Sequence, residues 1–127
     1  MNDAALAEER IREHYEDPYH RGACSAATHG HEEINPACGD RVRVELSIAA
    51  DGLVREACFD GDGCCISQAA ASMLIEHVEG RTITELQAFD AVAMLKLFGA
   101  RLTTQKQRCC LLSWRALQTA IAAPLGR

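Results

Sequence analysis

Seven cysteines in 127 residues are the most unusual chemical feature of this chain. An odd number excludes complete internal pairing, and no Cys-x-x-Cys spacing of a zinc ribbon or a redox pair is present. The first ten residues are acidic and lack the long apolar stretch of a secretory signal, so we expect a reducing compartment, the cytosol. In such a compartment, thiols that do metal or sulfur chemistry are more common than a disulfide framework.

Three of these cysteines lie where one element of secondary structure is expected to follow another. Cys38 precedes the first clear strand, and Cys64 follows a Gly-Asp-Gly turn and precedes a helix. Cys109 is expected in the first turn of the last helix. Because helix N-termini favour negative charge and lower the pKa of a thiol, we expect Cys64 and Cys109 to be thiolates.

Asp40, two residues after Cys38, adds a carboxylate to this set. Three thiolates and one carboxylate satisfy a tetrahedral zinc ion or one side of an iron–sulfur cluster. A carboxylate is a harder and weaker partner for these metals than a fourth thiolate, so such a site should exchange a ligand more readily. The alternative is that the cysteines are buried and inert, because a free cysteine is often a small core residue.

The other four cysteines are expected to be structural. Cys65 and Cys110 each follow a candidate ligand, and a helix turns by about 100° per residue, so each should face away from its neighbour and pack in the core. Cys24 and Cys58 are interpreted as structural or incidental.

Hydrophobic periodicity predicts the elements that must position these residues. Residues 41–48 alternate between apolar and polar side chains, and an Asp-Gly turn at 51–52 leads to a second strand over 53–59. Residues 18–40 are loop-rich, with a short strand near 27–34. Helices are expected over 4–16, 65–79, 90–98 and 107–123, with a capping box at Thr82–Glu85 that opens another. This order predicts an α+β fold, a small antiparallel sheet of about three strands packed against four to five helices.

Length and composition fit one globular domain over residues 1–127. Apolar residues make up 48% and charged residues 24%, which argues against disorder. The net charge of −5, from 13 Lys and Arg against 18 Asp and Glu, disfavours a nucleic-acid partner. No apolar run approaches the length of a transmembrane helix, so we expect no membrane partner either.

The chain carries four motifs in a fixed order: His14-Tyr15-Glu16-Asp17-Pro18, Asn35-Pro36-Ala37-Cys38-Gly39-Asp40, Gly61-Asp62-Gly63-Cys64-Cys65-Ile66-Ser67, and Arg108-Cys109 followed by Leu112-Ser113-Trp114-Arg115-Ala116-Leu117. Together they resemble the U-type iron–sulfur cluster assembly family, which includes IscU, SufU and the N-terminal domain of NifU. The resemblance covers about residues 8–123 and implies a fold of the SufE/NifU type. The family's metal site falls on the residues already singled out, Cys38, Asp40, Cys64 and Cys109.

Within that family, two features resemble the SufU branch and one resembles the IscU branch. Arg108 stands where IscU proteins usually carry a histidine, and residues 102–106 lack both prolines of the segment by which a dedicated chaperone recognises IscU. SufU proteins typically carry an insertion before the last motif, whereas here only residues 65–108 separate Cys64 from Cys109. On balance the chain is most similar to SufU-like members.

The resemblance to SufU implies a zinc-dependent sulfurtransferase that accepts persulfide sulfur from a PLP-dependent cysteine desulfurase. Cys38 is the implied acceptor and Cys109 the other candidate, and the sulfur would pass to a downstream cluster-assembly complex or to apo iron–sulfur proteins. The alternative is a scaffold, not an enzyme, on which Cys38, Cys64 and Cys109 bind iron or a [2Fe–2S] cluster. A third interpretation is a non-catalytic interaction module stabilised by zinc.

Overall fold

The structure is a computed structural model that describes residues 3–125. Its elements agree with the predicted α+β class and with the predicted order of strands and helices. They are α1 (Asp3–Glu16), β1 (His29–Asn35), β2 (Asp40–Ile48), β3 (Val54–Asp62), α2 (Cys65–Val78), α3 (Ile83–Gln87), α4 (Ala91–Phe98) and α5 (Thr104–Ile121).

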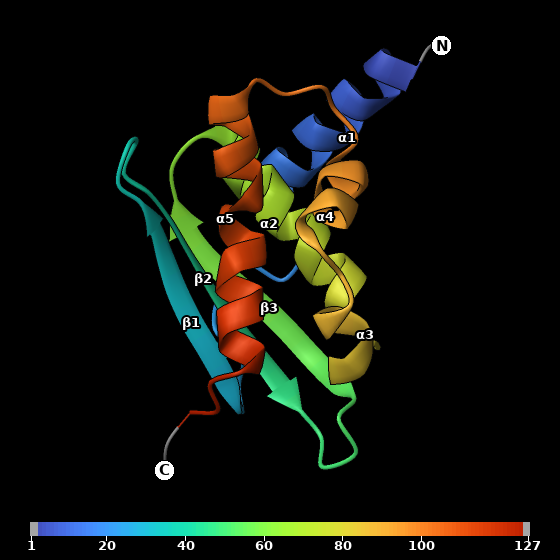
Figure 1. The fold of residues 1–127 in the computed structure, drawn as a ribbon, viewed down its shortest axis with the longest axis vertical. Coiled ribbons are helices and arrows are strands. Elements are labelled where there is room, and N and C mark those ends of the chain that lie inside the picture. The colour runs from blue at the N-terminus through green and yellow to red at the C-terminus, as the bar shows by residue number, and fades with distance from the viewer. Residues whose placement is uncertain (1–2, 126–127) are drawn as a thin grey trace.

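The three strands form one antiparallel sheet in the order β1-β2-β3 (Figure 1). The alternation read from residues 41–48 is confirmed, because Val42, Val44 and Leu46 of β2 are completely buried. In register with them on β3 lie Phe59, opposite Val44, and Ala57, opposite Leu46, and both are also completely buried. This face of the sheet therefore forms one side of the hydrophobic core.

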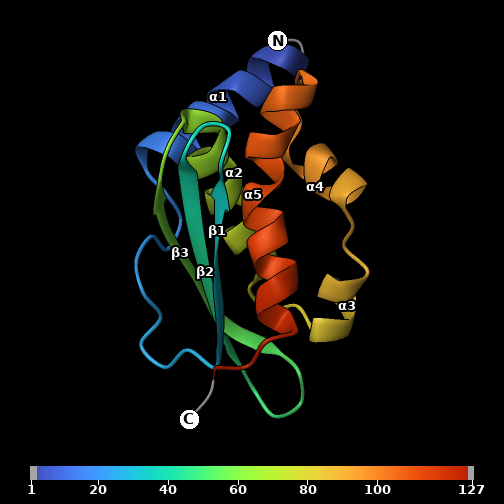
Figure 2. The same ribbon diagram turned by 60° about the vertical axis from the view of Figure 1, so that its left-hand side comes forward.

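Helices α2 and α5 contact each other and cover this one face of the sheet (Figure 2). Three consecutive alanines of α2, Ala69 to Ala71, are completely buried and keep this stretch of the helix small enough for close packing. Helices α1 and α4 pack against this pair, and the capping box predicted at Thr82 is present at the start of α3. Among the helices described for residues 3–125, none is long and apolar enough to cross a membrane.

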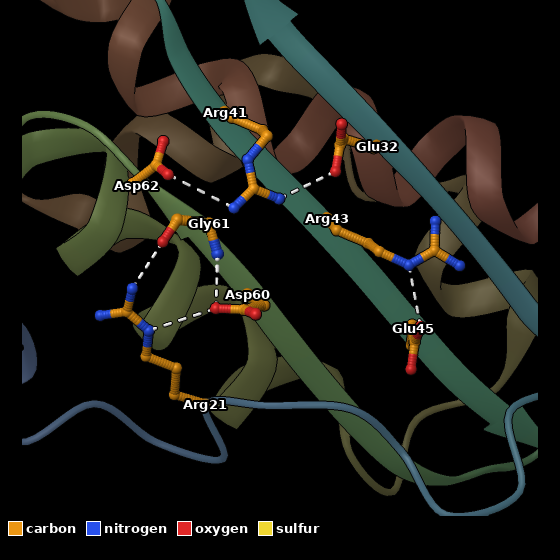
Figure 3. A network of polar contacts seen from close by, with 8 residues as sticks. All are labelled: Arg21, Glu32, Arg41, Arg43, Glu45, Asp60, Gly61 and Asp62. Carbon is orange, nitrogen blue, oxygen red and sulfur yellow. Dashed lines mark hydrogen bonds and ion pairs between the residues drawn. The ribbon is translucent and has the colours of Figure 1, made fainter.

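The opposite face of the sheet carries charged side chains. The loop between α1 and β1 crosses this face (Figure 2). Arg41 donates to Glu32 over 2.9 Å, and Arg43 donates to Glu45 over 2.8 Å. Arg21, on the loop, reaches Asp60 and the carbonyl oxygen of Gly61 on β3 (Figure 3). Exposed ion pairs of this kind each contribute little stability, although they link β2 to β1 and the loop to β3.

Two element boundaries differ from the sequence-based prediction by three residues. β3 continues through Gly61 to Asp62, because a Cβ at Gly61 would overlap the backbone carbonyl of Arg41, and glycine alone permits this close approach of β2 and β3. α5 begins at Thr104 rather than near residue 107, because the Thr103 hydroxyl accepts a hydrogen bond from the Lys106 N–H and caps the helix. Cys109 therefore lies in the second turn of α5.

Candidate metal centre

Cys38 lies at the tip of the turn that joins β1 to β2. The Asn35 carbonyl accepts hydrogen bonds from the N–H groups of Cys38 (3.2 Å) and Gly39 (2.7 Å), and the Asn35 side chain accepts one from the Ala37 N–H (3.1 Å). Gly39 adopts a positive φ of 79°, which completes the turn. The turn leaves Cys38 exposed.

Asp40 begins β2 on the core-facing side and is only 4% exposed. One carboxylate oxygen, Oδ1, accepts a hydrogen bond from the Cys64 N–H over 3.1 Å. The other, Oδ2, accepts one from the Cys64 thiol over 3.1 Å. Because Cys64 is the N-cap residue of α2, the carboxylate also lies at the positive end of that helix, where negative charge is favoured.

Gly63 makes room for this arrangement. Its φ is +142°, and a Cβ there would overlap the Asp40 carboxylate. No other residue type combines that backbone conformation with that free space. The Gly-Asp-Gly sequence before Cys64 thus does more than end β3, because its second glycine brings Asp40 against Cys64.

Cys109 completes the group from α5. Its thiol, a carboxylate oxygen of Asp40 and the thiol of Cys38 all lie within 4.8 Å of one another, at the end of the sheet where the β1–β2 turn, the start of α2 and the start of α5 meet (Figure 1). Sulfur ligands on a tetrahedral zinc ion lie about 3.8 Å apart, given a Zn–S bond of about 2.3 Å. Three of the four predicted residues, Cys38, Asp40 and Cys109, therefore lie at a spacing close to that of zinc ligands. The fourth, Cys64, adjoins them through the hydrogen bond from its thiol to Asp40.

The predicted lowering of the Cys109 pKa is wrong. Burial, and after it the neighbouring Cys64 and Cys38, together raise the pKa of this thiol to about 12. The physical reason is that Cys109 is 4% exposed and lies beyond the first turn of α5, so the helix dipole does not offset desolvation. A cation among the three thiols would remove this penalty, because it stabilises the thiolate form.

The pKa of Asp40, unlike that of Cys109, is lowered. Burial by itself would raise it, but hydrogen bonds from the Cys64 thiol and N–H, with contributions from Cys38 and Ser67, bring it below the ordinary carboxylate value. The carboxylate is therefore ionised at neutral pH and available as a ligand. A negatively charged oxygen beside three thiols is a donor set that attracts a thiophilic divalent cation.

Comparison with known proteins agrees with this geometry. A model of the family described as the NifU-like N terminal domain matches residues 6–127. The chain belongs to this family. The zinc-dependent sulfurtransferase SufU of Bacillus subtilis is 29% identical to this NifU-like domain, over 91% of the chain and 89% of that protein. The iron–sulfur cluster assembly scaffold protein IscU of Escherichia coli is 28% identical, over 90% of each protein.

Solved structures with the same fold include U-type proteins. A SufU from Fervidobacterium islandicum, described as an iron–sulfur cluster assembly scaffold protein for the SUF system, superposes with a TM-score of 0.71 at 23% identity, covering 89% of this chain and 94% of that one. A NifU-like protein from Brucella abortus superposes with a TM-score of 0.73 at 23% identity, covering 94% of this chain and 93% of that one. The predicted SufE/NifU-type fold is confirmed.

The remaining cysteines of this NifU-like domain divide into exposed and buried residues. Cys110 is completely buried in the core, as predicted, and burial raises its pKa to about 12. The prediction of a core position for Cys65 is wrong, because Cys65 is exposed. It is the first residue of α2 and precedes the stretch from Ser67 onward that packs into the core.

Sequence reasoning missed one residue that supports the centre, Ser67. Its hydroxyl donates a hydrogen bond to the Cys64 carbonyl over 3.0 Å and contributes to the lowered pKa of Asp40. The signal was available, because a serine three residues after an N-cap can return its side chain to the start of the helix.

Proposed function

We propose that this NifU-like domain is a zinc-dependent sulfur acceptor that works with a PLP-dependent cysteine desulfurase in iron–sulfur cluster assembly. Cys38, Asp40, Cys64 and Cys109 would hold the zinc ion. The sulfur taken up would pass to a downstream cluster-assembly complex or to apo iron–sulfur proteins. The name of the Bacillus subtilis SufU relative supports this choice of chemistry.

The observation that carries the proposal is the difference in exposure among the three thiols. Cys38 is exposed at the tip of a turn, Cys64 is half-buried and Cys109 is buried. A thiol that receives sulfur from another protein must reach into that protein's active site. Cys38 is therefore the favoured acceptor and Cys109, on the inner side of the centre, the less accessible alternative.

The transfer step is a thiol–persulfide exchange. The Cys38 thiolate attacks the terminal sulfur of the desulfurase persulfide, so that one S–S bond forms at Cys38 while the S–S bond to the desulfurase cysteine breaks. The desulfurase cysteine leaves as a thiolate, and no electrons are gained or lost overall. Cys38 must be deprotonated for this attack, and a bound zinc ion would supply that state near neutral pH.

The charges around the centre favour exchange of a ligand. Three thiolates and one carboxylate carry four negative charges against the two positive charges of zinc. Arg108 and Lys106 are exposed near the start of α5, next to Cys109, and can offset part of this excess. The Asp40 carboxylate is the hardest donor of the set and binds zinc less tightly than a thiolate, so the site should tolerate the loss of one ligand during transfer.

Turnover of the cognate cysteine desulfurase, with and without the zinc-loaded protein and in the presence of reductant, tests this proposal. We expect a many-fold increase in turnover with the wild-type protein and none with Cys38→Ala. Cys65→Ala is the matched control, since it removes an exposed thiol next to the centre. A turnover equal to that of the desulfurase alone would reject the sulfur-acceptor function.

A scaffold function is the second candidate, and one observation favours it. Only residues 65–108 separate Cys64 from Cys109, so the insertion typical of SufU proteins is absent, and several relatives are IscU scaffold proteins. The same donors would then hold a [2Fe–2S] cluster. Anaerobic reconstitution with iron and sulfide would give a stable cluster that transfers to an apo-ferredoxin if this candidate holds.

Asp40→Ala separates both candidates from a purely structural zinc site. In a transfer or scaffold protein the carboxylate is the exchangeable ligand, so its removal should slow the release of metal or cluster to a chelator. In a structural site the same substitution removes one of four ligands and should weaken binding. The rate of zinc transfer to a chromophoric chelator distinguishes the two outcomes.

A further inference from the structure

A second group of sulfur and oxygen donors lies on the opposite face of the sheet. The thiols of Cys24 and Cys58 and a carboxylate oxygen of Glu56 all lie within 4.8 Å of one another. Cys24 belongs to the loop between α1 and β1, and the other two belong to β3. Neither the proposed sulfur transfer nor the proposed scaffold function uses these residues.

The group is separated from the first centre in space. Cys58 is paired with Glu45 on β2, whereas Asp40 begins that strand five residues earlier. At about 3.4 Å per residue the two positions are about 17 Å apart along β2. Glu45 and Asp40 also point to opposite faces, because their positions differ by an odd number of residues.

The two thiols are buried and held in place. Cys24 is 8% exposed and Cys58 is 6% exposed. The Cys24 N–H donates to Oε1 of Glu45 over 3.0 Å, and the Cys24 thiol donates to the Glu45 carbonyl over 3.4 Å. Two residues earlier, the Gly22 N–H donates to the Phe59 carbonyl over 2.7 Å. The loop thus presents its thiol to β3 in a fixed position.

The electrostatic environment of the pair favours a cation. Burial raises the pKa of Cys24 and of Cys58, and the neighbouring Cys58 raises that of Cys24 further. The carboxylates of Glu56 and Glu45 act in the same direction on both thiols. Both thiols are therefore protonated at neutral pH in the metal-free protein and are poor nucleophiles. Carboxylates that disfavour a lone thiolate favour a positive ion among the same groups.

A small pocket of about 80 Å³ lies beside this group, on the side of the loop. It is lined by Ala23, the sequence neighbour of Cys24, and by Glu45, the hydrogen-bond partner of Cys24. Figure 3 shows Glu45 and Arg43 side by side on this face of the sheet, with Arg21 on the crossing loop.

We propose that Cys24, Cys58 and Glu56 form a second metal site, which binds a thiophilic divalent cation such as Zn²⁺. Binding forms two metal–sulfur bonds and one metal–oxygen bond, and the two thiol protons pass to solvent. A water molecule completes the tetrahedral coordination. The ion would fasten the loop between α1 and β1 to β3, on the face of the sheet away from the helices.

The third donor is the reason to favour a metal over a disulfide. A disulfide between Cys24 and Cys58 would use the two thiols and leave the Glu56 carboxylate without a role in the group. A divalent cation uses all three donors, and the carboxylate favours such an ion over a monovalent one that two thiolates alone would satisfy.

Zinc stoichiometry under reducing, anaerobic conditions tests the second site. We expect the wild-type protein to retain two equivalents of Zn²⁺ in competition with a chromophoric chelator, and Cys24→Ser and Cys58→Ser to retain one. Cys64→Ser should retain the second-site equivalent, and Cys65→Ser, the matched control, should retain both. Because a serine at a buried position can disturb folding, Glu56→Gln provides an independent variant that leaves both thiols in place, and we expect it to weaken the second equivalent at least ten-fold.

Three results would overturn the second site. One is that the wild-type protein retains a single equivalent of Zn²⁺ and that Cys64→Ser retains none. Another is a second equivalent that persists in both Cys24→Ser and Cys58→Ser. The third is a Cys24–Cys58 disulfide, seen by mass spectrometry after exposure to peroxide, in a protein that binds no second ion when reduced. None of these results bears on sulfur acceptance at Cys38, so the two proposals fail independently.

Discussion

Asp40 accepts two hydrogen bonds from Cys64, one from its N–H and one from its thiol, each over 3.1 Å. A single carboxylate thereby joins the first residue of β2 to the N-cap of α2. The same contact places a hard oxygen donor beside a soft sulfur donor, within reach of Cys38 and Cys109. Fold stability and metal affinity are thus coupled through one side chain.

The first prediction follows from this coupling. Asp40→Ala removes a charged acceptor from the half-buried N–H and thiol of Cys64, so the metal-free protein should lose about 2 kcal/mol of unfolding free energy. Asp40→Asn keeps one acceptor oxygen and should lose less. Urea titrations of both variants with excess chelator measure this difference, and equal stabilities would show that the carboxylate does not support the start of α2.

Gly63→Ala should disrupt the centre itself. A Cβ at this position meets the Asp40 carboxylate, and the positive φ adds backbone strain of about 1–3 kcal/mol. We expect a loss of zinc affinity of at least ten-fold, measured by chelator competition.

Gly52→Ala provides the matched control for that prediction. Gly52 also has a positive φ, of 89°, but a Cβ there meets no atom within 4 Å, and the residue lies in the turn between β2 and β3. This variant should lose stability by about 1 kcal/mol and keep its zinc affinity. Equal losses of affinity in the two variants would mean that strain, and not contact with Asp40, is responsible.

Alkylation rates should follow the burial of the thiols. In the metal-free protein Cys38 and Cys65, the two exposed cysteines, should react fastest with iodoacetamide. Zinc should protect Cys38 and leave Cys65 reactive, because only Cys38 lies in the donor group. Peptide mass spectrometry of protein quenched at intervals gives each rate, and equal protection of both thiols would argue against Cys38 as a ligand.

The sequence predicted the element order, and it singled out Cys38, Asp40, Cys64 and Cys109 as candidate ligands, because turns, caps and alternation are local signals. It did not predict that Cys109 lies in the second turn of α5, since the cap at Thr103 precedes the apolar stripe by several residues. Nor did it indicate that Cys24 and Cys58 meet. Their contact depends on the path of a loop with no periodicity across the outer face of the sheet, which only tertiary packing determines.

A further prediction concerns the dependence of stability on pH. Burial alone would raise the pKa of Glu79, but hydrogen bonds from the Tyr19 hydroxyl and the Ala57 N–H, with the contribution of His20, lower it below its ordinary value of 4.5. A carboxylate with a lowered pKa stabilises the fold above its unfolded-state pKa, and this contribution is lost as the pH falls through the folded-state pKa.

Glu79→Gln should therefore lower the free energy of unfolding by about 1–2 kcal/mol at neutral pH. It should also make stability fall less steeply below about pH 4.5. Glu76→Gln, in the last turn of α2 and with a side chain that is 57% exposed, is the control and should change stability by less than about 0.5 kcal/mol. Urea titrations over a series of pH values measure both. A variant as sensitive to acid as the wild type would exclude Glu79 as the stabilising group.

Mapping of the persulfide tests the central claim most directly. The zinc-loaded protein is incubated with the cysteine desulfurase and cysteine, and the free thiols are then blocked. Peptide mass spectrometry identifies each cysteine that carries the mass of one added sulfur atom. The account predicts that the added sulfur is on Cys38 in the wild-type protein and in Cys65→Ala, and that Cys38→Ala acquires none. Sulfur on Cys65, or an unchanged yield of persulfide in Cys38→Ala, would contradict it.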